Sequence, residues 1–157
     1  MTRLLLAVSL LALPFFGHAA DSSPGTDEAA VKAVLASYQS ALERRDLTGT
    51  EALFATDNVV AESGKLEGSY SDYVANHIGP ELGHFKRFAF SDYTVRVERV
   101  GDVAWAMETY RYVIDLKDRA ELIEREGLST TVLQRIDGAW KIRSMHSSSR
   151  APKPPAP

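Results

Sequence analysis

The sequence predicts an α+β fold, in which N-terminal helices pack in a strongly curved antiparallel sheet that forms a conical barrel. Two features of the hydrophobic pattern predict it. Apolar residues recur at helical spacing over residues 27–46 and 70–85, whereas from residue 87 onward they alternate as they do in strands. Helices followed by a run of long strands are typical of α+β proteins, in which the helices cover one face of the sheet.

The N-terminus has the pattern of an export signal. Arg3 supplies a positive charge, residues 4–16 are apolar apart from Ser9 and Pro14, and small residues precede a cleavage site after Ala19. Cleavage after Ala20 is the alternative. The apolar run is shorter than the roughly 20 residues that a membrane-spanning helix needs. We therefore expect an exported protein, periplasmic or secreted. Its expected parts are a signal peptide at 1–19, a linker at 20–26, one domain at 27–149 and a disordered proline-rich tail at 150–157.

Composition excludes several classes of function. The chain has 157 residues, no cysteine and a formal net charge of −3. This length fits one domain with its own core, and without cysteine there is neither a disulfide nor a thiolate metal site. Acidic and basic residues are interspersed, so no nucleic-acid partner is expected. A small molecule is the expected partner, and no membrane span is expected once the signal is removed.

Helical spacing defines the first part of the domain. Thr26 can cap a helix that ends near Asp46, because a threonine oxygen accepts a hydrogen bond from the first helical turn. Its buried face is expected to carry Val31, Val34, Leu35, Tyr38 and Leu42. A short helix around 50–55, a strand at 59–63 and a loop at 64–68 are expected next.

The central helix carries most of the side chains that could do chemistry at neutral pH. Ser69 and Asp72 resemble a capping box, so the helix is expected to begin near Tyr70. A kink is expected at Gly79-Pro80, since proline lacks a backbone donor and crowds the preceding turn. Three polar residues, spaced four and three apart, follow one side of this helix: His77, Glu81 and His84.

Alternation defines the strands that follow. Phe88 and Phe90 share one parity and Tyr93 begins the other, so a bulge is expected at Ser91-Asp92. Further strands are expected at 103–116, 122–136 and 139–147, and Asp137-Gly138 is a strong hairpin signal between the last two.

Strand parity also assigns side chains to faces. One face of strand 103–116 carries Glu108, Tyr110 and Tyr112, and the opposite face carries Trp105 and Met107. In the last strand one apolar face is expected to carry Trp140, Ile142 and His146.

Several segments together resemble the SnoaL-like branch of the nuclear transport factor 2-like superfamily. They are AVLASYQSALERRD, LFATDNVV, EGSY, DVAWAMETYRY and VLQRIDGAWKIRSMHSSSR, and the resemblance covers residues 27–150. It implies a conical α+β barrel with an apolar pocket, often dimeric through the sheet. Enzymes of the ketosteroid isomerase and polyketide cyclase kind use a pocket carboxylate as a proton shuttle, helped by aromatic hydroxyls or a histidine. Because no catalytic motif of these enzymes matches residue by residue, the candidate site rests on this sequence alone.

The leading hypothesis is a small, partly apolar ligand in the cone, with isomerase, cyclase or dehydratase chemistry if any reaction occurs. A carboxyl beside apolar walls has its pKa raised, which suits it to exchange protons near neutrality. Candidate catalytic residues are Glu81 or Glu62 as the base, assisted by His77 or His146. Candidate ligand-binding residues are Tyr73, Glu108, Tyr110, Tyr112 and Trp140. The structural alternative has Glu81 solvated, Glu108 paired with an arginine such as Arg125, and the tyrosines filling the core.

Two other functions fit the same residues. Zinc or copper could be held by His77, Glu81, His84 and His146, which are ligand types that suit these metals. No other cofactor is expected. Alternatively, the chain is a non-catalytic interaction module that forms a homodimer through the outer sheet face around Trp105 and Met107.

Overall fold

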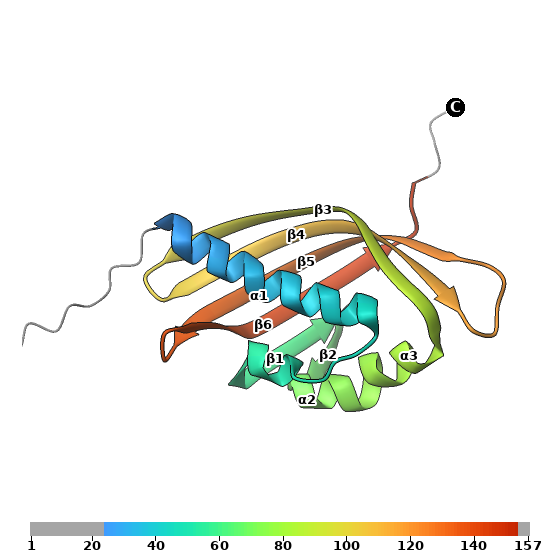
Figure 1. Cartoon of the computed structure of the whole chain (residues 1–157), viewed down its shortest axis with the longest axis horizontal. Coiled ribbons are helices and arrows are strands. Elements are labelled where there is room, and N and C mark those ends of the chain that lie inside the picture. Colours follow the sequence, from blue (N-terminus) through green and yellow to red (C-terminus); the bar gives the residue numbers. More distant parts are fainter. Residues whose placement is uncertain (1–23, 154–157) are drawn as a thin grey trace, which may run out of the picture.

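The computed structural model describes residues 24–153. The predicted signal peptide, the first part of the linker and the last residues of the tail lie outside the described residues. In chain order the elements are α1 (Pro24–Arg44), a 3₁₀ turn (Thr50–Leu53), β1 (Phe54–Glu62), β2 (Lys65–Gly68), α2 (Tyr70–Tyr73), a π-helical turn (Val74–Ile78), α3 (Gly79–His84), β3 (Phe85–Val100), β4 (Val103–Leu116), β5 (Ile123–Ile136) and β6 (Ala139–Arg150) (Figure 1).

The six strands form one curved, unclosed sheet in the order β2-β1-β6-β5-β4-β3, and α1 lies across its concave face (Figure 1). The α+β prediction is confirmed. The expectation of a purely antiparallel sheet is wrong, because β1 pairs with β6 in parallel. Alternation of side chains is the same in parallel and antiparallel strands, so the sequence pattern does not distinguish the two.

Two local predictions differ from the structure. Helix α1 begins at Pro24, inside the predicted linker, and proline suits a first helical position because the missing N–H would be unpaired there. The expected loop at 64–68 is instead strand β2, antiparallel to β1. Ser63 and Gly64 connect the two with φ angles of 48° and 85°, which is the backbone that a two-residue hairpin turn requires.

The helical predictions for 69–84 are confirmed in their main features. The Ser69 side chain accepts from the Asp72 backbone N–H, and the Asp72 carboxylate accepts from the Ser69 backbone N–H, which completes a capping box. The helix is interrupted by the π-helical turn and restarts as α3, with Pro80 in its first turn. Gly79 fits this turn because a Cβ there would lie 2.3 Å from the Val74 carbonyl oxygen.

Bulges in two strands decide which side chains face inward. The predicted bulge at Ser91-Asp92 is confirmed by a register shift between Ser91 and Thr94. A second bulge was not predicted: Leu133 pairs with Ile142, but Val132 pairs with Ser144, so β6 holds one extra residue. The parity of β6 therefore reverses after Ile142, and His146 is exposed. The prediction that His146 shares the face of Trp140 and Ile142 is wrong for this reason.

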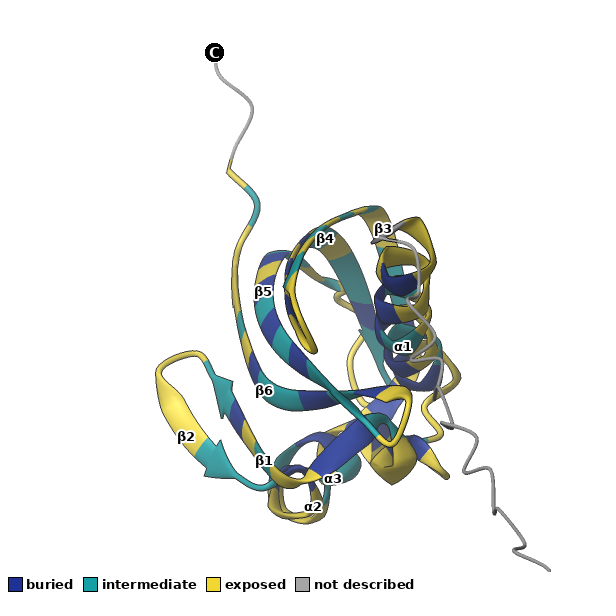
Figure 2. Ribbon diagram, turned by 90° about the vertical axis from the view of Figure 1, so that its left-hand side faces the viewer, coloured by how far each residue is buried: buried dark blue, intermediate teal, exposed yellow. Residues whose placement is uncertain are grey.

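The core lies between α1 and the concave sheet face, where buried residues of both elements meet (Figure 2). At the N-terminal end of α1, the buried Asp27 carboxylate accepts from Arg135 Nη2 at 2.6 Å and from Trp140 Nε1 at 3.3 Å. Arg99 Nε lies 3.4 Å from the same carboxylate. This polar cluster fixes the start of α1 to the sheet. Among the described residues, no helix is long and apolar enough to cross a membrane.

Candidate ligand-binding pocket

A cavity of about 110 Å³ lies between α1, the helical segment 70–84 and the concave face of the sheet. Its lining combines aromatic and aliphatic side chains with a few carboxyl and hydroxyl groups: Leu35, Tyr38, Gln39, Leu42, Glu62, Tyr73, Ile78, Glu81, Phe85, Phe88, Phe90, Tyr93, Glu108, Tyr110, Tyr112, Ile114, Ser129, Thr131, Met145 and Ser147. An engineered apolar cavity of about 150 Å³ binds benzene. The pocket is therefore suited to a molecule with about one ring.

Glu108 is the most deeply buried acidic group of this lining. The residue is 8% exposed, and its side chain points inward from β4, as strand parity predicts. Glu108 Oε1 accepts from the Tyr93 hydroxyl at 2.7 Å and Oε2 accepts from the Thr131 hydroxyl at 3.2 Å. Burial raises the pKa of the Glu108 carboxyl, although the bonds from Tyr93 and Thr131 oppose this shift. The expected pairing of Glu108 with an arginine is not what the structure shows.

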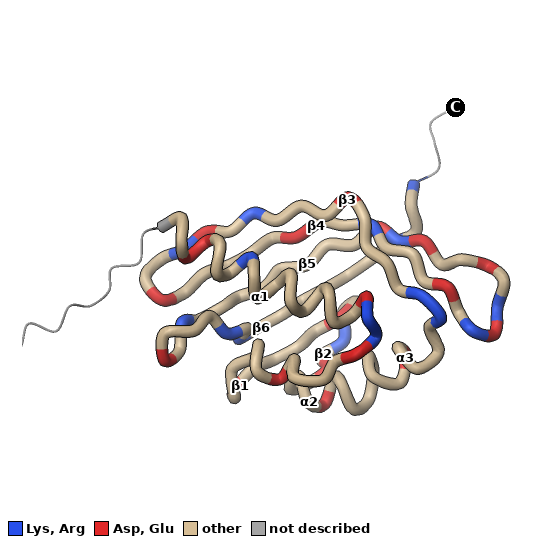
Figure 3. Tube along the Cα trace, in the orientation of Figure 1, with Lys and Arg blue, Asp and Glu red and all other residues tan. Residues whose placement is uncertain are grey.

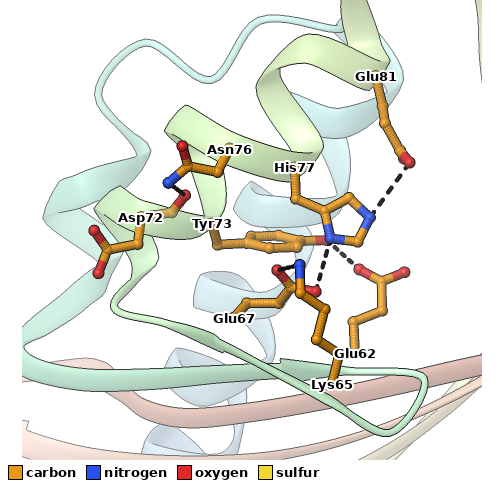
Figure 4. A network of polar contacts seen from close by, with 8 residues as sticks. All are labelled: Glu62, Lys65, Glu67, Asp72, Tyr73, Asn76, His77 and Glu81. Carbon is orange, nitrogen blue, oxygen red and sulfur yellow. Dashed lines mark hydrogen bonds and ion pairs between the residues drawn. The ribbon is translucent and has the colours of Figure 1, made fainter.

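A second pair of a carboxylate and a tyrosine stands at the end of β1. The Tyr73 hydroxyl, on α2, donates to Glu62 Oε2 at 2.6 Å (Figure 4). Glu62 pairs in the sheet with Ser147 of β6, and all three residues line the cavity. Burial, together with nearby negative charge, raises the pKa of Tyr73, so its hydroxyl stays protonated and acts as a donor.

His77 connects the pocket rim to the β2 hairpin. Its Nε2 lies 3.3 Å from Glu81 Oε1, and its Nδ1 lies 2.9 Å from Glu67 Oε1 (Figure 4). Glu67 also pairs with Lys65 at 2.8 Å, a contact that lowers the pKa of its carboxyl. Burial and the neighbouring Glu62 raise the pKa of Glu81, whereas His77 opposes the shift. His77 itself does not line the cavity, but it contacts two residues that do, Glu81 and Tyr73.

Two tyrosines of β4 complete the polar lining. The Tyr112 hydroxyl bonds with Ser149 at 2.8 Å. The Tyr110 ring lies over Gly127 of β5, where an added Cβ would come within 2.1 Å of it. Within residues 24–153 the Tyr110 hydroxyl has no hydrogen-bond partner, and burial raises its pKa. Tyr110 is thus a protonated donor that is available to a bound molecule.

Of the four predicted metal ligands, the structure brings His77 and Glu81 together but not His84 or His146. His84 and His146 are exposed and absent from the lining, and within residues 24–153 no group of three or more acidic or histidine side chains is arranged for a metal. The two carboxylates beside His77 lie at opposite ring nitrogens, so one ion cannot bind His77 and both acids. Trp140 is also outside the lining, because its indole N–H is directed to Asp27.

A family model described as the SnoaL-like domain matches residues 31–152 of this chain. The chain belongs to the SnoaL-like family. No curated protein matches the sequence of this SnoaL-like chain.

Solved structures place the SnoaL-like chain in the NTF2-like fold. A provisionally assigned dehydratase of the NTF2-like family from Streptomyces avermitilis is 19% identical, with a TM-score of 0.71 over 83% of this chain and 100% of that one. An NTF2-like superfamily protein from Salmonella enterica serovar Typhimurium is 18% identical, with a TM-score of 0.72 over 83% and 94%. The hexachlorocyclohexane dehydrochlorinase LinA-type3 from Novosphingobium barchaimii is 17% identical, with a TM-score of 0.67 over 82% and 88%.

Several lining residues of the SnoaL-like pocket were not predicted as site residues. Phe88, Phe90 and Tyr93 all reach the cavity because the bulge in β3 reverses the strand parity between Phe90 and Tyr93. The bulge was visible in the sequence, but the pocket role of these residues was not inferred from it. For Ser129 and Thr131 the sequence showed only that they alternate along a strand, and nothing in it indicated that they line a pocket.

Proposed function

We propose that this SnoaL-like protein binds a small, partly apolar molecule of about one ring in its cone, with Glu108 as the acid–base group. One observation carries the proposal: a carboxyl that is 8% exposed and has a raised pKa borders a cavity lined largely by apolar and aromatic groups. Binding pockets for small molecules are mostly apolar with a few converging polar groups. Perturbed carboxyls in such pockets are candidates for catalysis.

The geometry supports proton transfer by Glu108 with help from Tyr110. Both side chains point inward from β4 and are two residues apart, which separates their Cα atoms by about 7 Å. A bound molecule between them could lose a proton from carbon to the Glu108 carboxylate. The Tyr110 hydroxyl would then donate to the oxygen on which negative charge develops. Isomerisation results when Glu108 returns the proton to another carbon. Cyclisation results when the carbanion attacks a carbonyl carbon of the same molecule and the alkoxide formed takes the proton from Glu108. Dehydration results when a hydroxyl group takes that proton and leaves as water.

The predicted bases Glu81 and Glu62 take other roles in this proposal. Glu62 accepts a hydrogen bond from the Tyr73 hydroxyl at the cavity wall and can accept another from the ligand. Glu81 stands at the rim, with its side chain 52% exposed, and His77 positions it. Elimination is consistent with the names of two similar structures, a dehydrochlorinase and a provisionally assigned dehydratase. No cofactor is required for this chemistry.

Binding and proton transfer can be tested with cyclohexanone as a ring-sized neutral probe. Calorimetric titration measures binding, and NMR in D₂O measures exchange of the protons beside the carbonyl. General acid–base groups contribute about 10²–10⁴-fold, so Glu108→Gln is expected to slow the protein-dependent exchange by at least about 100-fold. The control is Glu98→Gln, a strand glutamate whose side chain is 44% exposed. An absence of binding, or equal exchange by both variants, would refute the proposal.

Export and dimerisation are part of the same proposal. Export rests on the N-terminal charge and apolar run, and would be checked by sequencing the N-terminus of the protein from the extracellular or periplasmic fraction. A start at Ala20 is expected, and a retained Met1 would contradict export.

Dimerisation rests on the outer sheet face, where Trp105 and Met107 are 40% and 51% exposed.

A further inference from the structure

Among the described residues, the lining of the cavity combines aromatic rings with carboxyl groups, which are negative when ionised, and has no basic side chain. Within the described residues, Glu62, Glu81 and Glu108 line it together with five tyrosines and three phenylalanines, and no lysine, arginine or histidine does. The basic residues are placed elsewhere: in Figure 3 some gather at the end of α1, at the start of β3 and in the turn between β4 and β5, and others are spread along the strands. The electrostatic character of the pocket therefore differs from that of the mixed surface.

The hydrogen bonds inside the cavity do not neutralise this charge. Glu62 accepts from Tyr73, and Glu108 accepts from Tyr93 and Thr131. These donors are neutral hydroxyls, so they orient the carboxylates but add no opposite charge. Outside the lining, the imidazole of His77 contacts Glu81 through one ring nitrogen and Glu67 through the other. Lys65 pairs with Glu67 and not with a carboxyl of the cavity. The charge on the inner carboxylates is left for a bound molecule to balance.

A group of aromatic rings lines the same cavity as Glu108. Phe88 and Phe90 lie 4.8 Å apart between ring centroids, Tyr110 lies 5.3 Å from Phe90, and Tyr112 lies 5.5 Å from Phe88. All four rings reach the cavity from β3 and β4, and Glu108 is on β4 as well. Aromatic faces attract cations through the ring quadrupole, and groups of such rings recognise quaternary ammonium compounds.

We infer that the ligand of this pocket is a small organic cation, a quaternary ammonium or protonated amine compound, whose charge lies between Glu108 and the rings of β3 and β4. This inference rests on the proposed function, because it names the class of molecule that the same cavity takes. An anion would be repelled by three carboxyl groups. A neutral molecule would leave the carboxylates without an opposite charge, whereas a cation satisfies both the carboxylates and the aromatic faces.

Choline and 3,3-dimethylbutan-1-ol test directly whether the pocket prefers a positive charge. The two molecules have the same shape, and the alcohol has a neutral carbon where choline has N⁺. Calorimetric titration of the purified protein measures both. Choline is expected to bind at least about tenfold more tightly than the neutral alcohol. Glu108→Gln should remove most of this preference, and Phe90→Leu should reduce it by removing one ring. Trp105→Leu is the control, since Trp105 is an exposed ring on the outer face.

The outcomes separate this inference from the proposed function. Equal or tighter binding of the neutral alcohol overturns the cation inference, and so does a preference that Glu108→Gln and Glu62→Gln both leave unchanged. If cyclohexanone binds and choline does not, the cation inference fails while the proposed function stands. If neither choline nor cyclohexanone binds, both fail. Circular dichroism of each variant verifies that a lost preference does not come from a lost fold.

Discussion

The contact between Gly127 and Tyr110 gives a prediction that can be worked out from distances. An alanine Cβ at position 127 would lie 2.1, 2.7 and 2.8 Å from the Tyr110 atoms Cε2, Cδ2 and Cζ. Three contacts shorter than 3 Å cannot be relieved without moving the ring. The Phe90 ring also packs against it edge to face, at 5.3 Å between centroids. In Gly127→Ala the Tyr110 ring must therefore shift away from β5, which alters the cavity that it lines.

Overpacking of this kind costs typically about 1–3 kcal/mol. For a domain of this size, that loss corresponds to a melting temperature lower by about 4–10 °C. Urea unfolding measures the free energy, and titration with cyclohexanone measures whether the displaced ring alters the pocket. Both stability and binding are expected to fall. Gly83→Ala is the matched control, because nothing lies within 4 Å of an added Cβ at that position.

A double-mutant cycle tests whether the ring is the cause. In a Tyr110→Ala background the same change at Gly127 meets no ring, so its cost should largely disappear, and contacting residues typically show coupling of about 0.5–3 kcal/mol. The reasoning is refuted if Gly127→Ala alters the unfolding free energy by less than about 0.5 kcal/mol, the range of ordinary surface substitutions. It is equally refuted if the cost is the same with and without the Tyr110 ring.

Three further predictions concern a titrating group, a polar cluster and the outer sheet face. Because burial raises the folded-state pKa of Glu108 above the unfolded value of 4.5, its contribution to stability is greatest below that value and is lost as pH rises toward the folded pKa. Urea unfolding should show wild type losing stability relative to Glu108→Gln over this range; a constant difference contradicts the shift. Asp27→Asn removes the charge that Arg135 and Arg99 share, so the melting temperature at pH 7 should fall more than in Asp118→Asn, which changes an exposed aspartate; an equal or smaller fall would show that the ion pairs do not stabilise α1. Trp105→Glu places a charge on the exposed outer face and should convert a dimer into a monomer in sedimentation velocity; an identical profile for variant and wild type argues against this interface.

Local sequence patterns predicted well those features that depend on residues close together in the chain. The capping box at Ser69, the bulge near Asp92 and the hairpin at Asp137-Gly138 all lie where expected. Each is decided by contacts between residues close in the chain. The inward face of β4 was also predicted, because that strand alternates without interruption from Ala104 to Tyr112.

Strand parity failed for His146, where one extra residue in β6 reversed it. No turn residue marks that bulge in the sequence, because it arises from the pairing of β6 with Val132 and Leu133 of β5. The role of Trp140 was missed for a similar reason. Its partner Asp27 is 113 residues away in the chain, and no local pattern relates the two.

Hydrophobic spacing and turn chemistry along short segments are sufficient to predict the helices, most strands and their buried faces. The tertiary structure decided which of the acidic and aromatic side chains share one cavity, and it selected Glu108 in place of Glu81 as the buried carboxyl. The physical reason is that burial and the pKa of a carboxyl depend on neighbours from β3, β4 and β5, which only the curvature of the sheet brings around it.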